Sequence, residues 1–222
     1  MEIKILENIF ESNREMAEEI RSLLKEKKVY MIDIMSSPGA GKTTLTDTII
    51  GKLKHEYRFG VIEGDIKTAT DAEKLAKHDI PIVQIETSLF GGDCHLESSW
   101  IMKSLDHFDL DDIDCIIIEN VGNLVCPAEF ELGDDERMVV LSVTEGEDKP
   151  IKYPLMFNSS RTMVLSKTDL LPYLPYNIDT AIANARRANP DITIIKTSAL
   201  SGEGIGDLLD HLRKNIDRKK SA

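Results

Sequence analysis

The sequence lacks the features that mark secreted and membrane-spanning proteins. It has only three cysteines in 222 residues, Cys94, Cys115 and Cys126, and their spacing does not form a disulfide framework. In a reducing compartment such thiols serve as core residues, metal ligands or catalysts. No apolar run approaches the roughly 20 residues needed to cross a bilayer. The N-terminal segment is mixed and acidic, without a signal-peptide core. We therefore expect a cytoplasmic protein.

Positive charge is also scarce. The chain has 27 Lys and Arg against 39 Asp and Glu, which gives a formal net charge of −12. Such a surface repels nucleic acid and anionic membranes, so we expect neither as a partner. A phosphate ligand is still compatible with this charge, because local loops and a bound cation can reverse the field. The length suits one domain with a full-sized core, or one domain with a short appendage.

Short apolar runs alternate with segments of helical spacing along the chain. Buried parallel strands are predicted at residues 29–35, 58–64, 80–87, 114–120, 137–146, 161–169 and 192–200. Helices are predicted at 42–54, 71–78, 95–108, 178–188 and 204–219. This alternation predicts an α/β fold, mainly a parallel sheet with helices on both faces. No linker divides the chain, so we expect one domain over residues 29–217 and a frayed tail at 218–222.

The first 28 residues form a separate unit in this scheme. Residues 6–27 place apolar side chains at helical spacing, with charges between them: Leu6, Ile9, Phe10, Met16, Ile20, Leu23 and Leu24. This pattern predicts an amphipathic helix. Packing of the helix on the domain is the simpler interpretation, and a helix that binds a partner is the alternative.

A glycine-rich segment, SSPGAGKTT at residues 36–44, lies between the first predicted strand and the first helix of the domain. Backbone N–H groups at such a turn converge on phosphate oxygens, reinforced by the helix N-terminus. Lys42 would reach the β- and γ-phosphates, and the Thr43 hydroxyl would hold Mg²⁺. Ser36 stands where the general motif has its first glycine, yet the strand–loop–helix placement favours a phosphate loop over an ordinary turn. The expected nucleotide contacts are Ser37, Gly39, Ala40, Gly41, Lys42, Thr43 and Thr44.

Carboxylates follow two of the predicted strands. Asp65 and Glu119 end strands whose carboxyl ends share an edge with the phosphate loop, where α/β sheets bind ligands. Hard oxygen ligands suit Mg²⁺. We therefore assign Lys42, Asp65 and Glu119 to catalysis, with Asp71 as a candidate to orient the attacking water. A helix cap or turn residue is the alternative for Asp65, and a plain helix-start carboxylate for Asp71.

Further elements resemble the nucleotide-reading motifs of GTPases. ENVG resembles their DxxG element, in which a glycine amide, here that of Gly122, senses the γ-phosphate. SKTD at 166–169 resembles NKxD: Asp169 can accept two hydrogen bonds from guanine, and the Lys167 stem can lie over the base. TSALSGEG resembles the element whose backbone N–H meets guanine O6, which Ser198 and Ala199 would carry. Together these elements disfavour two unrelated turns, and they disfavour a small-molecule kinase or an ATPase.

The remaining chemistry lies in two cysteine-containing loops. Cys94 and His95 occur in FGGDCHLES, and Cys126 follows Glu119 by seven residues in ENVGNLVCPAE. Thiolate and imidazole suit zinc, and imidazole also suits nickel. Three ligands leave a coordination position open, as a transferable ion requires. Unrelated surface residues are the alternative for Cys94 and His95, which the position of Cys126 disfavours. Cys115, within an apolar strand, is a core thiol, and His55, His78, His107 and His211 are expected at the surface.

Seven segments together resemble the hydrogenase nickel-incorporation GTPase family, which is the hydrogenase maturation factor HypB family. These segments are SSPGAGKTT, EGDI, FGGDCHLES, ENVGNLVCP, VTEGEDKPIKYP, SKTDLLPY and TSALSGEG. The resemblance covers about residues 6–217. It implies GTP hydrolysis and a GTP-favoured homodimer. It also implies a Ni²⁺ or Zn²⁺ site at the subunit interface, with Cys94, His95 and Cys126 as ligands. A hydrogenase maturation partner or a hydrogenase large subunit would be the client.

The sequence lacks the N-terminal CxxCGC motif and the histidine-rich tract of some family members, so we expect no storage of many nickel ions. Two alternatives remain beside the hydrogenase type. The urease accessory GTPase has a similar phosphate loop but a Cys-Pro-His metal motif. A non-catalytic scaffold would keep the nucleotide and the metal only structurally, which Lys42, Thr43 and Asp65 disfavour. The ligands accept nickel and zinc alike.

Overall fold

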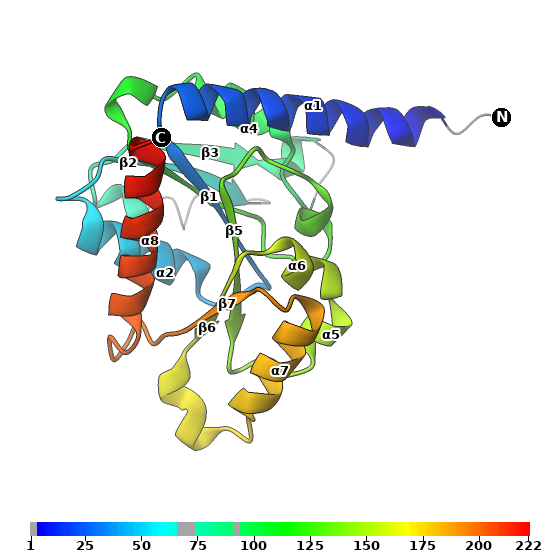
Figure 1. Ribbon diagram of the computed structural model, residues 1–222, viewed down its shortest axis with the longest axis vertical. Coiled ribbons are helices and arrows are strands. Elements are labelled where there is room, and N and C mark those ends of the chain that lie inside the picture. Colours follow the sequence, from blue (N-terminus) through cyan, green and yellow to red (C-terminus); the bar gives the residue numbers. More distant parts are fainter. Residues whose placement is uncertain (1–3, 66–73, 91–93) are drawn as a thin grey trace.

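The computed structural model describes residues 4–65, 74–90 and 94–222 of the chain (Figure 1). Its centre is one sheet of seven strands in the order β3-β2-β4-β1-β5-β6-β7, and every neighbouring pair is parallel. The strands are β1 (Tyr30–Ser36), β2 (Phe59–Asp65), β3 (Ile82–Glu86), β4 (Cys115–Glu119), β5 (Glu136–Ser142), β6 (Thr162–Ser166) and β7 (Thr193–Lys196). All seven predicted strands are present, and the predicted parallel α/β fold is confirmed.

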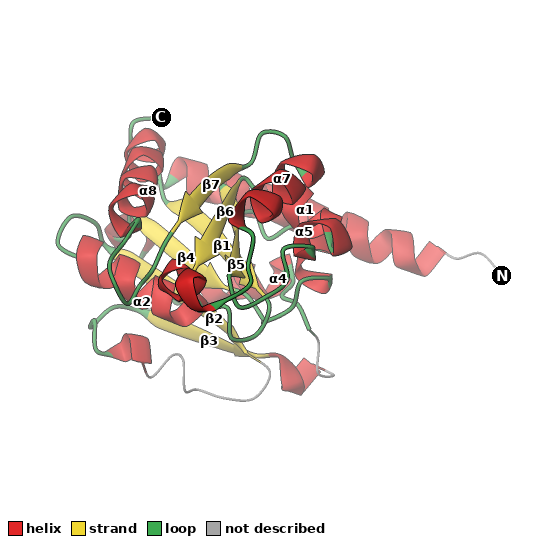
Figure 2. Cartoon of the chain, turned by 90° about the horizontal axis from the view of Figure 1, so that it is seen from below, coloured by secondary structure: helices red, strands yellow, loops and turns green. Residues whose placement is uncertain are grey.

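Helices cover both faces of the sheet (Figure 2). They are α1 (Lys4–Glu26), α2 (Lys42–Leu53), α4 (Ser98–Leu105), α5 (Lys149–Lys152), α6 (Pro154–Ser159), α7 (Ile178–Ala188) and α8 (Ile205–Lys220). Tyr30, Ile32 and Ile34 of β1 share a buried cluster with residues of α2 and α8. The alternate side chains of β1 point the other way, and Met31 packs with residues of α1 and α4. A third cluster joins β5 and β6 to α6 and α7.

Helix α1 lies along the sheet beside α4, and its N-terminal part extends past the sheet (Figure 1). Ala17, Ile20 and Leu24 have no exposed surface, because they face the sheet cluster that α1 shares with α4. The apolar stripe of residues 6–27 is thus used for packing along its C-terminal half. None of the described helices is long and apolar enough to cross a membrane.

The C-terminal end differs from the expected frayed tail. Helix α8 continues to Lys220, three residues past the predicted end of the domain at 217. Ion pairs hold its last turn against the amino ends of the strands: Lys219 contacts Asp135 at 2.7 Å, and Lys220 contacts Asp114 at 2.9 Å. These basic side chains also complement the helix dipole.

Two histidines are more buried than expected. His78 bonds to Asp47 at 2.6 Å, and His211 lies 2.8 Å from the buried Glu136. Glu136 also accepts hydrogen bonds from Tyr30 (2.5 Å) and Thr162 (2.6 Å). These bonds fasten α8 to strands β1, β5 and β6. His55 and His107 are exposed, as predicted.

Candidate functional site

The phosphate loop has the predicted strand–turn–helix geometry. β1 ends at Ser36, and α2 begins at Lys42. Gly39 and Gly41 have φ angles of 76° and 104°, which side chains rarely adopt. The Lys42 ammonium donates to the Ser36 hydroxyl at 3.1 Å. Ser36, in place of the usual glycine, therefore holds the lysine beside the loop.

The loop opens onto a cavity of about 520 Å³ lined by the phosphate loop, the ends of β2 and β4, and Lys167. Thr43 lies at its inner wall and donates to Glu119 Oε1 at 2.6 Å. Asp65 and Gly122 line the same space. The strand ends thus bring together Lys42, Thr43, Asp65 and Glu119, the residues expected to hold phosphate and magnesium. Asp71 lies outside the described residues.

Glu63 is a cavity residue that the sequence analysis missed. It is 2% exposed and pairs in register with Glu119 across β2 and β4, so the two side chains share one face of the sheet. Its position two residues before Asp65 is the period-2 signal that could have identified it. The hydroxyl and carboxylate oxygens gathered here are hard ligands, and the set fits a magnesium ion.

Gly122 lies against the phosphate loop. A Cβ atom at this position would come within 3.2 Å of Pro38 Cγ and 3.3 Å of the Pro38 backbone. A side chain here would require the phosphate loop to shift by a few tenths of an ångström, so glycine lets the backbone of the loop after β4 approach the phosphate loop closely. Gly122 thus lies at the cavity beside the phosphate loop, and its role as a γ-phosphate sensor stays a prediction.

The two expected base-reading segments are joined to each other and to the phosphate loop. Ser198 Oγ donates to Asp169 Oδ1 at 2.5 Å. The Lys167 ammonium donates to the Gly39 carbonyl at 2.7 Å, and the Ser166 hydroxyl donates to the Ala40 carbonyl at 2.8 Å. Ser166, in place of the asparagine of the general motif, therefore still ties this strand end to the phosphate loop.

The residues of the two base-reading segments differ in their access to the cavity and in their backbone hydrogen bonds. Lys167 has a left-handed φ of 61° and lines the cavity, whereas Asp169, Ser198 and Ala199 are not among the lining residues. The Ser198 N–H donates to the Glu203 carbonyl at 2.9 Å. Of the two N–H groups expected to meet guanine O6, that of Ser198 is thus already engaged.

Cys94, His95 and Cys126 form a cluster, as the sequence analysis expected. Their ligand atoms all lie within 4.8 Å of one another, and the two sulfur atoms are 2.7 Å apart. Both thiols are free and half-buried. Cys115 lies 1% exposed within β4, away from this group. Burial raises the pKa of the Cys115 thiol well above its usual value, as expected for an inert core residue.

The segment between Glu119 and Cys126 joins the nucleotide cavity to this cluster. At its start, the Asn120 side chain donates to both carboxylate oxygens of Asp33 in β1, at 3.0 and 3.2 Å. Burial raises the pKa of Asp33 to about 7. Further along, Asn123 Nδ2 donates to the Cys94 carbonyl at 3.2 Å, and Asn123 Oδ1 accepts from Val125 N–H at 2.9 Å. Asn123 therefore ties the two cysteine-bearing segments together.

The parallel sheet, the glycine-rich loop after its central strand and the cavity at the carboxyl ends define a P-loop nucleotide-binding protein. A family model described as the CobW/HypB/UreG nucleotide-binding domain matches residues 30–196. The chain belongs to this family, and within it to the hydrogenase maturation factors called HypB.

Relatives of this name resemble the chain in sequence and structure. The Escherichia coli K12 hydrogenase maturation factor HypB is 44% identical over 96% of this chain and 71% of its own length. The Archaeoglobus fulgidus HypB structure is 33% identical with a TM-score of 0.85, covering 92% of this chain and 98% of that one. HypB from Helicobacter pylori, solved in complex with nickel, is 33% identical with a TM-score of 0.87, covering 94% and 97%.

Proposed function

We propose that the chain is a Mg²⁺-dependent GTPase that carries a nickel or zinc ion and uses the nucleotide cycle to deliver nickel to a hydrogenase. The observation that carries this proposal is the segment from residue 119 to 126. It leaves the nucleotide cavity at Glu119, passes the phosphate loop at Gly122, and ends at the candidate metal ligand Cys126. Seven residues span at most about 25 Å even when extended, so loss of the γ-phosphate would act on Cys126 through one short segment.

In this proposal the residues of the chain promote phosphoryl transfer mainly by positioning the nucleotide phosphates and stabilising the charge that develops on them. The phosphate-loop N–H groups hold the phosphates, and Lys42 stabilises the charge that develops on the γ-phosphoryl group. Thr43 and Glu119, with Asp65 or Glu63, would hold magnesium. When bound, magnesium would neutralise charge on the β- and γ-oxygens.

Guanine selection rests on Asp169. Its carboxylate would accept hydrogen bonds from guanine N1–H and the exocyclic amine, which adenine cannot offer in that arrangement. The bond from Ser198 fixes the orientation of this carboxylate. Because the Ser198 N–H is bonded to Glu203, we assign the O6 contact to the Ala199 N–H. The Lys167 ammonium, anchored on Gly39, would leave its aliphatic stem to lie over the base.

The metal ion is the cargo in this scheme. Two thiols and an imidazole supply three ligands and leave at least one position for water, a ligand from a second subunit or the acceptor. The H. pylori relative solved with nickel supports nickel as the ion. We propose a homodimer favoured by GTP, and a maturation partner or the hydrogenase large subunit as the recipient.

The nucleotide and metal sites can be tested together. GTP turnover is measured with Mg²⁺. Equilibrium Ni²⁺ and Zn²⁺ binding is then measured in the GDP and GTP-analogue states, with molecular mass in parallel. We expect GTP-selective turnover and a metal affinity that differs between the two states by about 5–150-fold, the usual range of allosteric coupling.

Two results would count against the proposal. Absence of turnover with intact metal binding would identify the scaffold alternative. Equal metal affinities in the GDP and GTP-analogue states would overturn the delivery cycle. Linkage requires that the metal shift the relative nucleotide affinities by the same factor, which provides an internal check.

A further inference from the structure

His95 is held by an aromatic ring rather than by a hydrogen bond. Both of its ring nitrogens are buried, and neither has a hydrogen-bond partner among the described residues. The Glu97 carboxylate is 3.8 Å away, too far for a hydrogen bond. The imidazole instead stacks on Phe130, with ring centroids 3.8 Å apart and planes inclined by 16°. A metal binds a histidine nitrogen in the ring plane, so Phe130 sets the direction in which His95 offers its lone pair.

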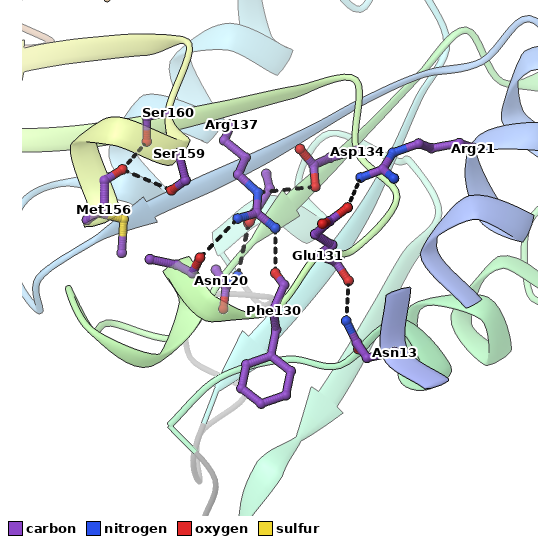
Figure 3. Close-up of polar contacts among 12 residues, drawn as sticks. Asn13, Arg21, Asn120, Phe130, Glu131, Asp134, Arg137, Met156, Ser159 and Ser160 are labelled. Carbon is purple, nitrogen blue, oxygen red and sulfur yellow. Dashed lines mark hydrogen bonds and ion pairs between the residues drawn. The ribbon is translucent and has the colours of Figure 1, made fainter. Parts of the chain in front are cut away.

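Phe130 is itself fixed from two sides. The buried Arg137 guanidinium donates to the Phe130 carbonyl and, at 3.4 Å, to the Ala128 carbonyl. Figure 3 shows this guanidinium between Phe130 and Asp134, to which it bonds at 3.5 Å. On the other side, the Phe130 ring meets Phe10 of α1 at a centroid distance of 5.3 Å. The contacts from Arg137 and Phe10 therefore set the place of Phe130.

Asn13 of α1 contacts both ligand-bearing segments at once. Its amide nitrogen donates to the Glu131 carbonyl at 2.8 Å, five residues after Cys126 (Figure 3). Its side-chain oxygen accepts from Ser98 N–H at 2.9 Å, and its carbonyl accepts from the Ser98 hydroxyl at 2.8 Å. Ser98 follows His95 by three residues. A single side chain thus sets the spacing between the segment of Cys94 and His95 and the segment of Cys126.

We infer that Phe130 and Asn13 are positioning residues of the metal site, and that α1 supports the site although none of its described residues is a ligand. The inference rests on the metal-binding function proposed above. Phe130 orients the imidazole, and Asn13 holds the two ligand-bearing segments at the distance at which their sulfur atoms meet. Outer contacts of this kind typically change metal affinity by about 10–100-fold.

The test measures Ni²⁺ and Zn²⁺ dissociation constants by competition with a chromophoric chelator. Phe130→Leu and Asn13→Ala are expected to raise both constants by about 10–100-fold. Phe130→Tyr, which keeps the stacked ring, is expected to restore affinity to within a few-fold. Cobalt(II) absorption provides a second readout, because displacement of the imidazole changes the ligand field.

The matched controls are Phe108→Leu and Glu15→Ala. Phe108 is 8% exposed, as Phe130 is, but it packs in the sheet cluster. Glu15 is exposed on α1, two residues from Asn13. Thermal unfolding of the metal-free protein is measured for all variants. We expect Phe108→Leu to lower the melting temperature as Phe130→Leu does, while its metal affinity and cobalt spectrum match those of the unmodified protein.

Three outcomes decide the inference. Wild-type affinity and spectrum in Phe130→Leu and Asn13→Ala would overturn it and leave the proposed function intact. An equal loss of affinity in Phe108→Leu would also overturn it, because general destabilisation would then explain the effect. If the unmodified chain binds no metal, and Cys126→Ala behaves identically, the proposed function fails and the inference fails with it.

Discussion

The nucleotide cavity and the candidate metal site are built in different ways, although one short segment joins them. The nucleotide cavity is formed at the ends of β1, β2 and β4, and its key side chains are fixed by the register of a buried parallel sheet. The candidate metal ligands lie on no strand. Cys94 and His95 precede α4, and Cys126 begins a short 3₁₀ helix.

This difference shows where each site is sensitive to change. The sheet register positions the residues proposed to bind phosphate, whereas the candidate metal ligands depend on contacts from α1 and from Asn123. Substitutions distant from the ligands should therefore affect metal binding more than nucleotide binding. The following predictions test this contrast, in order of decreasing expected effect.

Replacing Lys42 should have the largest effect. Lys42→Ala removes a positive charge from the phosphates, and loss of one such stabilising donor typically lowers the catalytic rate by about 100–1,000-fold. GTP hydrolysis is followed by phosphate release. Lys52→Ala, on the exposed last turn of the same helix, is the control. Circular dichroism should show both variants folded, because Lys42 faces the cavity rather than the core. Normal turnover in Lys42→Ala would mean that the loop is not a phosphate loop.

Metal binding should distinguish the three thiols of the protein. Cys94→Ala and Cys126→Ala remove a ligand, so their metal dissociation constants should rise by more than the roughly 10–100-fold expected for an outer contact. Cys115→Ala should leave metal affinity unchanged, because that thiol is buried in β4. Chelator competition measures all three. GTP turnover with Mg²⁺, but without added nickel or zinc, should remain within a few-fold of wild type in Cys94→Ala, since the sheet holds the cavity. A loss of binding in Cys115→Ala would contradict the assignment.

Replacing one carboxylate oxygen of Asp169 by an amide nitrogen should change the preference of the protein among nucleotides. Asp169→Asn loses hydrogen bonds to a charged acceptor and should weaken GTP binding by about 1.5–3 kcal/mol. Binding of xanthosine triphosphate should improve, because an amide complements the xanthine edge. Competition with a fluorescent nucleotide measures both changes, and Asp179→Asn on the exposed side of α7 serves as the control. Equal affinity of the unmodified protein for ATP and GTP would remove this prediction.

At the amino end of β5, opposite the strand ends that form the nucleotide cavity, Glu136 should affect stability and not function. Burial disfavours its ionised form, but hydrogen bonds from His211, Thr162 and Tyr30 outweigh burial and lower its pKa below the usual 4.5. A lowered pKa contributes stability above pH 4.5 that is lost as the pH falls through the folded-state value.

Glu136→Gln should therefore lower the free energy of unfolding by about 1.5–3 kcal/mol near pH 7, and less under acidic conditions. Urea unfolding between pH 3 and 7 measures the difference, while GTP turnover should match wild type. A destabilisation of the same size at pH 3 and pH 7 would show that the charge of Glu136 is not the cause.

The strands were predictable because parallel strands buried on both faces leave continuous apolar runs in the sequence. The geometry of the phosphate loop and the proximity of the two cysteine-containing loops were predictable for a related reason, since each lies where a strand or its following loop reaches a common edge. The role of Asp169 stays a prediction. The period-2 spacing of Glu63 and Asp65 along β2 also indicated that Glu63 faces the cavity, although the prediction overlooked it.

The supporting contacts were not predictable in this way. Asn13 meets Ser98 across 85 residues and Glu131 across 118, and no periodicity connects such positions. The bonds of His78 to Asp47 and of Glu136 to His211 were unpredictable for the same reason. So were the ion pairs of Lys219 and Lys220 at the C-terminal end of α8. These contacts depend on how elements pack, which sequence pattern specifies only through the fold as a whole.

The place of β1 in the sheet has a consequence for the order in which the protein can be made. Both of its neighbours, β4 and β5, lie more than 75 residues further along the chain, and α8 covers one of its faces. A growing polypeptide halted before residue 115 would present the phosphate-loop strand with both edges unpaired, a template for aggregation. The proposed base-reading pair of Asp169 and Ser198 is completed later still, because Ser198 is synthesised after every strand. The nascent chain would therefore expose unpaired strand edges through most of its translation, and the proposed nucleotide selection could begin only after its last strand is made.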